Sequence, residues 1–306
     1  MTLELLLEQT LNGVQFGVFL FLIAAGLTLV FGIMNMVNLA HGSLYMMGAY
    51  YAATIVQLTG SFFLALVLTI PCALLTGIVL EVVALRTLYD RDHMDQVLAT
   101  FGLILFFNEL VRLVWGAEAQ PMPIPDVFDG TVEIFGVPYP LFRLVIIVAG
   151  ILVAAFLFIL ISRTRIGMLI RAGASNRQMV ASLGINIRLL YTLVFGLGAA
   201  LAGIAGVMAG PILAVEPGMG ESMLILAFVV IVVGGIGSIR GAVVSSIIVG
   251  VVETVGRSTL PYLLTQVLSS DDAQTAGPAL ASMLIYILMA GVLFFKPEGL
   301  FPARTG

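Results

Sequence analysis

The densest group of polar side chains beside an apolar run lies between residues 35 and 45. Asn35, Asn38 and His41 are spaced by three residues, a spacing that predicts one shared helix face, and Ser43 and Tyr45 follow. Uncompensated polar groups are costly in hydrocarbon, so these side chains should face a bundle interior, a partner or water. We expect a structural turn that also lines a pathway. The alternative is a tight turn in which the Asn side chains bond only the backbone.

A second interrupted apolar stretch contains Gly234, Gly235, Gly237 and Ser238, which we expect to line the same pathway. Its glycines resemble a nucleotide-binding fingerprint, but no strand–turn–helix pattern surrounds them, so that reading is rejected. Residues 25–50 and 227–250 share one plan: an apolar run, a Gly-rich or polar break and a second apolar run. Paired interrupted segments are typical of a transporter's central pathway. A shared Gly-rich composition is the alternative explanation.

Several kinds of chemistry are excluded by composition. No carboxylate or serine stands at a usable spacing from His41 for a catalytic set. Lys296 is the only lysine, so the GxxxxGK[ST] loop that binds ATP phosphates does not occur, and any ATP must be bound by another chain. Cys72 is the only cysteine, which rules out a disulfide or a thiolate metal cluster within the chain. We expect no cofactor and no metal.

Most acidic residues are predicted either to pair with a basic residue or to lie near the end of an apolar segment. Glu109 with Arg112 and Glu253 with Arg257 are spaced for ion pairs on one helix face, and Glu81 should serve the basic loop that follows it. The other acidic residues stand near the ends of apolar segments. This pattern disfavours a stand-alone ion-coupled carrier, which would place an unpaired carboxylate at mid-membrane.

The elements that must position these residues are membrane helices. The chain has 306 residues, of which 60% are hydrophobic and only 10% charged, whereas soluble proteins average about 25% charged residues. We predict an all-α polytopic membrane protein with nine apolar segments, at 11–33, 40–59, 62–85, 96–115, 140–162, 189–211, 222–237, 241–260 and 276–295. The seventh and eighth are short and some helices could be broken, so eight spans are also possible.

The basic residues predict the orientation. If the loop 163–188 is cytoplasmic and the spans alternate, ten basic residues fall inside. They are Arg86, Arg91, Arg163, Arg165, Arg171, Arg177, Arg188, Arg240, Lys296 and Arg304. Only Arg112, Arg143 and Arg257 fall outside, so the N-terminus should be outside and the C-terminus inside.

The basic loop 163–188 should contain a short capped helix at 176–183. Ser175 and Gln178 fit a capping box, and Gly184 is suited to a left-handed stop after Leu183. The apolar positions Met179, Val180 and Leu183 need a partner surface. We read this helix as a docking element; the alternative is a helix that lies on the bilayer surface. The proline-rich outer loop 116–139 should be extended, as an acidic lid or a plain connector.

Three motifs resemble one known family. GLTLVFGIMNMVNLAHGSLYMMGAY, RAGASNRQMVASLGIN and VVIVVGGIGSIRGA occur in this order in the H-type permease subunits of bacterial high-affinity branched-chain amino acid ABC importers. The resemblance covers nearly the whole chain and implies one permease domain over 1–306, in the inner membrane. In many members a Glu follows the His-Gly pair where Ser43 stands here, so urea, short amides or another small organic solute are alternative cargoes.

The resemblance also implies partners: a second homologous permease, two cytoplasmic ABC ATPase subunits and an external solute-binding protein. It implies that ATPase docking falls to Arg171, Ala172, Asn176, Met179, Val180, Ala181, Leu183, Gly184, Ile185 and Asn186. Uptake would proceed by alternating access. The alternative from another class is a stand-alone channel or ion-coupled carrier. A membrane enzyme lacks an acid–base–nucleophile set, and nothing in the sequence indicates nucleic-acid binding.

Overall fold

The structure is a computed structural model that describes residues 3–134 and 136–302. Arg304, one of the predicted inner basic residues, lies outside the described residues. The described residues contain an apolar helix at each of the nine predicted segments. They are α1 (Leu3–Met34), α2 (His41–Thr59), α3 (Phe62–Val83), α4 (His93–Trp115), α5 (Leu141–Arg163), α8 (Ile187–Ala209), α9 (Met219–Gly234), α10 (Ile239–Leu264) and α11 (Ser270–Phe295).

The predicted polytopic and mostly helical architecture is confirmed, whereas the exact number of spans and the orientation stay predictions. In the described part of the chain, seven helices are long and apolar enough to cross a membrane. The other two apolar helices are α2 and α9, and α9 has only 16 residues. These two helices flank the predicted breaks.

The core is built around α1 and α8, which are buried over most of their length, whereas α5 and α11 are mostly exposed. Small residues let the inner helices approach closely. A Cβ on Gly203 of α8 would lie 2.6 Å from that of Ala73 in α3, and one on Gly17 of α1 would lie 2.7 Å from the carbonyl oxygen of Ser246 in α10. The exposed apolar faces of the outer helices suit a lipid environment.

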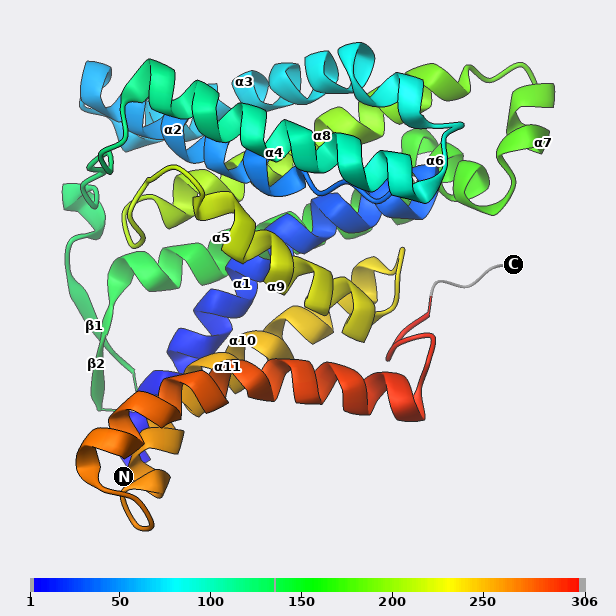
Figure 1. Cartoon of the computed structure of the whole chain (residues 1–306). Coiled ribbons are helices and arrows are strands. Elements are labelled where there is room, and N and C mark those ends of the chain that lie inside the picture. Colours follow the sequence, from blue (N-terminus) through cyan, green and yellow to red (C-terminus); the bar gives the residue numbers. More distant parts are fainter. Residues whose placement is uncertain (1–2, 135, 303–306) are drawn as a thin grey trace.

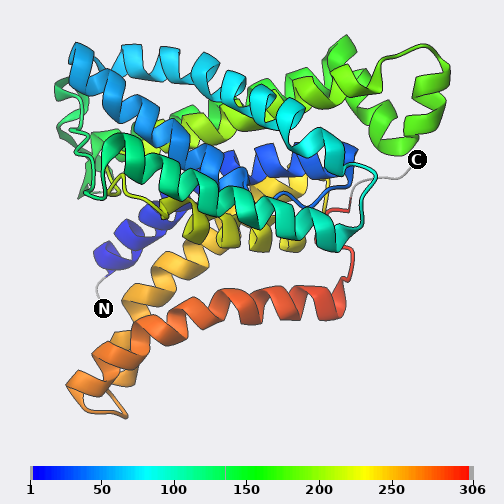
Figure 2. The ribbon, with the colours of Figure 1, turned by 45° about the horizontal axis from the view of Figure 1, so that its top comes forward.

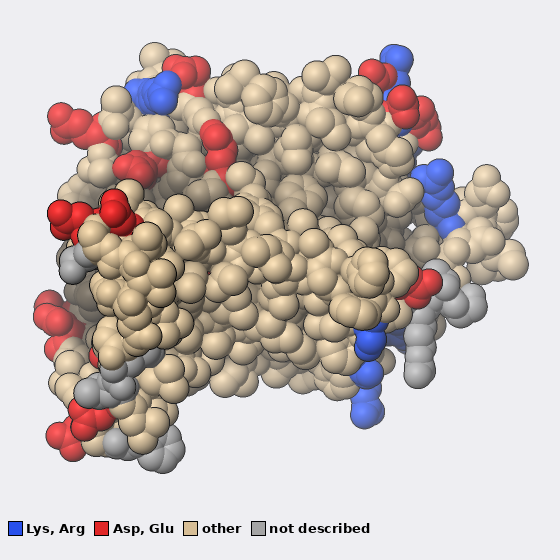
Figure 3. Space-filling view, turned by 60° about the horizontal axis from the view of Figure 1, so that its bottom comes forward, with Lys and Arg blue, Asp and Glu red and all other residues tan. Residues whose placement is uncertain are grey.

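The two ends of the bundle differ. The N-terminus and the hairpin of β1 (Thr131–Ile134) and β2 (Val137–Pro140) lie at one end, and α7 (Arg177–Ser182) lies at the other (Figures 1 and 2). Figure 3 shows most acidic side chains at the hairpin end and most basic side chains at the opposite end, where some acidic side chains also lie. In the predicted extended loop 116–139, a short 3-10 helix forms at Asp126–Phe128 and the strands of this antiparallel hairpin follow. A role of this loop as a lid or a connector stays a prediction.

Candidate functional site

Two helices begin inside the bundle, and their N-termini meet. Gly42 in the first turn of α2 and Gly220 in the first turn of α9 lie backbone against backbone. A Cβ on either glycine would come closer than 3.0 Å to the carbonyl oxygen of the other, a distance that real Cβ atoms essentially never show. Glycine at both positions is therefore what allows this head-to-head contact.

The contact lies at mid-depth in the bundle. A Cβ on Gly26 of α1 would lie 2.9 Å from His41 Nε2 and 2.6 Å from the carbonyl oxygen of Gly198. Gly198 is the midpoint of α8, so α2 begins level with the middle of a full-length helix. Helix N-termini that meet at mid-depth are typical of the substrate sites of transporters.

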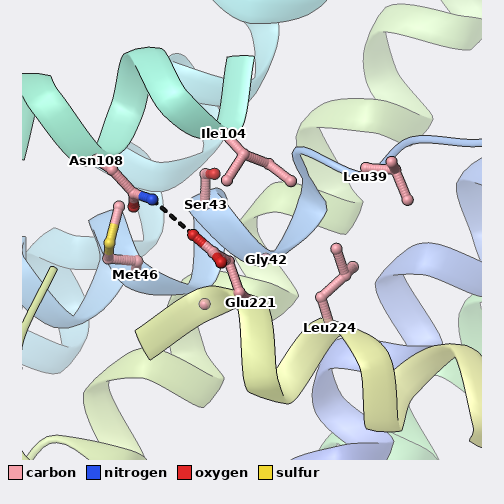
Figure 4. Close-up of a pocket in the computed structure, with 9 residues that line it drawn as sticks. Leu39, Gly42, Ser43, Met46, Ile104, Asn108, Glu221 and Leu224 are labelled. Atoms are coloured by element: carbon pink, nitrogen blue, oxygen red, sulfur yellow. Dashed lines mark hydrogen bonds between the residues drawn. The ribbon is translucent and has the colours of Figure 1, made fainter. Parts of the chain in front are cut away.

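A crevice surrounds this contact. Its lining comes from α2, α4, α9 and the segment before α2, and consists of Leu39, Gly42, Ser43, Met46, Ile104, Asn108, Gly220, Glu221 and Leu224 (Figure 4). In this conformation the crevice has no room for a water molecule. A solute could pass only if these helices moved apart.

Three polar side chains converge in the crevice from three helices. Asn108 Nδ2 of α4 donates a hydrogen bond of 2.6 Å to Glu221 Oε1 of α9 (Figure 4). Ser43 of α2 is 3% exposed, and its hydroxyl has no hydrogen-bond partner among the described residues. The crevice thus offers a carboxylate, an amide and a free hydroxyl.

Glu221 was not singled out from the sequence. The described residues form three ion pairs, Glu81–Arg86, Glu109–Arg112 and Glu253–Arg257, and Glu221 belongs to none of them. The predicted ion pairs Glu109–Arg112 and Glu253–Arg257 are confirmed, and so is the pairing of Glu81 with the basic loop that follows it. Glu221 lies at the start of an apolar helix, as expected of the other acidic residues, but α9 begins at mid-depth rather than at the end of the bundle. A carboxylate just before a short apolar segment was the available signal.

The predicted pathway residues around the first break do not all line the crevice. Ser43 lines the crevice, and Asn38, His41 and Tyr45 are buried beside it. The prediction that Asn35, Asn38 and His41 share one helix face is wrong, because residues 35–40 are not helical and Asn35 has a left-handed φ of 50°. The backbone-bonding alternative holds for Asn38, whose Oδ1 accepts from Ala40 N at 3.1 Å.

The second break does not join the crevice. Ser238 caps α10, accepting from Gly241 N at 3.1 Å, and Gly235 and Gly237 adopt left-handed φ values of 105° and 81°. Gly234 accepts a 3.0 Å hydrogen bond from Phe301 N, which places this turn beside the segment that follows α11. A pathway role for these residues stays a prediction.

The basic loop contains two helices rather than one. An additional helix, α6 (Arg165–Ser175), precedes α7, which has six residues. The Ser175–Gln178 capping box is wrong, because α6 continues through Ser175. Asn176 caps α7 instead, with Oδ1 accepting from Met179 N at 2.9 Å.

The predicted end of α7 is confirmed, since Gly184 has a left-handed φ of 82° and its N–H bonds Ala181 O at 3.0 Å. The apolar stripe is divided: Val180 is buried, whereas Met179 and Leu183 are 63% and 74% exposed. Arg171, Asn176, Ala181, Gly184 and Asn186 are exposed too, and Ala172 and Ile185 are half-buried. The exposed members form a protruding surface (Figure 2).

A buried polar cluster ties α8, which follows α7, to α3. The fully buried Glu81 carboxylate accepts from Arg86 at 3.0 and 3.2 Å, from Thr192 Oγ1 of α8 at 2.7 Å and from the Tyr89 hydroxyl. Burial first, and then the bond to Glu81, raise the pKa of the Tyr89 phenol, so it remains a protonated donor. The ends of α3 and α8 on the α7 side are therefore fixed to each other.

The chain is similar to known permease proteins over nearly its whole length. The chain is 32% identical to the high-affinity branched-chain amino acid transport system permease protein BraD of Pseudomonas aeruginosa, over 96% of this chain and 95% of that protein. It is 32% identical to the permease protein LivH of Escherichia coli K12, over 95% and 96% of the two chains. The ribose import permease protein RbsC of Haemophilus influenzae is 24% identical over 75% of this chain. No solved structure matches.

The family described as the permease component of branched-chain amino acid transport systems matches residues 9–293, nearly the whole chain. A match of this extent includes the three helices that line the crevice, α2, α4 and α9, and also α6 and α7. The chain belongs to the family of branched-chain amino acid transport permeases.

Proposed function

We propose that this chain is the permease subunit of an ATP-driven importer of branched-chain amino acids in the bacterial inner membrane. Its N-terminus lies outside and its C-terminus inside. It works with a second homologous permease, two cytoplasmic ABC ATPase subunits and an external solute-binding protein. The observation that carries the proposal is the capped helix α7, whose exposed apolar side chains protrude from the basic end of a bundle that has no ATP-binding loop of its own.

The structure supplies a route from α7 to the crevice. Asn186 caps α8 immediately after α7, accepting from Leu189 N at 3.1 Å, so movement of α7 acts on the start of α8. Farther along α8, Gly206 lies against the backbone of α2 near Tyr45 and Ala49. Because α2 carries one wall of the crevice, a shift of α8 would change its width.

Alternating access follows from this route. ATP closes the ATPase pair, α7 transmits the movement as a rigid lever, and α2, α4 and α9 separate toward one side of the membrane at a time. The closed crevice in the present conformation supports a barrier at mid-depth.

The docking role of α7 is tested by Met179→Ser combined with Leu183→Ser. Both side chains are exposed, so folding should be unaffected, while co-purification of the ATPase subunits should fall at least tenfold. Val267→Ser, 86% exposed at the opposite end of the bundle, is the matched control and should leave co-purification unchanged. Full ATPase recovery with the double variant would contradict the proposal.

A second candidate is an ion-coupled carrier, favoured by the mid-depth carboxylate of Glu221, which has no cationic partner within residues 3–134 and 136–302. This candidate predicts uptake by the purified chain alone under a proton or sodium gradient. The ABC permease predicts none. Gradient-driven uptake into liposomes separates the two.

A further inference from the structure

We propose that Glu221, oriented by Asn108, recognises the protonated amino group of the solute as it passes the crevice. This inference rests on the proposed function and adds the residue that binds the solute inside the membrane. It makes Glu221 a specificity-determining residue of this permease.

The first step is the position of the charge. Glu221 lies beside the Gly42–Gly220 contact at mid-depth, is exposed in the single chain and forms no ion pair among the described residues. An ionised carboxylate facing lipid at this depth would cost several kcal/mol. The crevice side of α9 must therefore face water, a partner or a mobile cation rather than lipid.

The second step is the chemistry of the acceptors. Asn108 donates its amide N–H to Glu221 Oε1. This bond leaves Asn108 Oδ1 and the second carboxylate oxygen of Glu221 available as hydrogen-bond acceptors. The hydroxyl of Ser43, a residue that lines the crevice, is a third acceptor and has no partner among the described residues. An ammonium group has three N–H donors, which matches three acceptors. No group of His, Cys, Asp or Glu in the described chain fits a metal ion.

The third step is the surroundings of these acceptors. α2 and α9 begin at the crevice without a side-chain cap; α5 also lacks one, whereas α3, α4, α6, α7, α8, α10 and α11 are each capped by a side chain. Uncapped N-termini favour an anion, such as the carboxylate of an amino acid. Leu39, Ile104 and Leu224 add an apolar wall suited to a branched side chain. The opened crevice is thus complementary to all three parts of an apolar amino acid.

The test uses the complete complex in proteoliposomes, with the external binding protein and leucine. Glu221→Gln should lower maximal leucine uptake by about tenfold or more, the equivalent of one charge-assisted hydrogen bond. The leucine concentration for half-maximal uptake, which the binding protein sets, should not change, and neither should ATP hydrolysis. Glu221→Asp should recover part of the rate. Glu109→Gln, one residue from Asn108 but paired with Arg112, is the matched control and should match the wild type.

A second measurement keeps the inference testable if Glu221→Gln folds poorly. Ser43→Cys in a Cys72→Ala background keeps Glu221, and during ATP turnover a cationic methanethiosulfonate should modify it at least tenfold faster than an anionic one. Leucine should slow the cationic reaction. Equal rates for the two reagents, or full leucine uptake by Glu221→Gln, would overturn the inference. Absence of leucine uptake by the wild-type complex would instead refute the proposed function.

Discussion

At the scale of single residues, the crevice depends on two glycines that touch. A methyl group on Gly42 would collide with the backbone of Gly220, which has no flexible side chain to yield. Gly42→Ala should therefore destabilise the protein by about 1–3 kcal/mol and abolish transport, because α2 and α9 would be forced apart. Gly102→Ala, in a helix with nothing near the added methyl group, should be neutral or slightly stabilising. Thermal unfolding in detergent and leucine uptake measure both effects; wild-type behaviour of Gly42→Ala would contradict this packing.

Glu81 is the second residue on which the fold depends. Its fully buried carboxylate accepts hydrogen bonds from Arg86, Tyr89 and Thr192. Because Glu81→Gln removes the charge that pairs with Arg86, it should lower the free energy of unfolding by about 3 kcal/mol. Glu109→Gln breaks an exposed pair and should change it by less than about 1 kcal/mol. Equal melting temperatures for the two variants would show that the buried cluster contributes little.

At the scale of elements, α7 is too short to be stable without its caps. Asn176→Ala removes the side chain that bonds Met179 N and should cost about 1 kcal/mol, enough to unfold six residues locally. We expect ATPase activity to remain but leucine uptake per ATP to fall severalfold. Ser269→Ala removes the equivalent cap of α11 at the opposite end and should leave this ratio unchanged. An unaltered ratio for Asn176→Ala would argue against a rigid lever.

The sequence was sufficient for the nine apolar helices, because burial in lipid demands about 20 apolar residues and hydropathy reports that length directly. Depth was harder to predict. α2 and α9 start at mid-depth because Gly42 meets Gly220 and His41 fits against Gly26, contacts between residues distant in sequence. For the same reason the position of Glu221 in the crevice was not predicted.

Local chemistry was only partly readable around α7. Gly184 was identified because a left-handed stop strongly favours glycine. Ser175 and Asn176 are both residue types that favour helix N-caps. Asn176 is the cap because α6 continues through Ser175, and the basic composition of the loop gave no sign of this additional helix.

At the scale of the whole molecule, the separation of charge between the two ends predicts the orientation (Figure 3). In a Cys72→Ala background, Ser182→Cys at the end of α7 should react with an impermeant thiol reagent only in inside-out vesicles. Thr131→Cys in the hairpin should react only in right-side-out cells. The reverse pattern would place α7 outside, where cytoplasmic ATPases have no access to it.

The central claim is that this chain forms a passage and obtains its energy from separate ATPase subunits. The most direct test is leucine uptake into proteoliposomes that contain the permease pair, with and without the ATPases, the binding protein and ATP. We predict accumulation only when all are present. Accumulation of leucine by the permease alone, driven by an ion gradient, would contradict the claim.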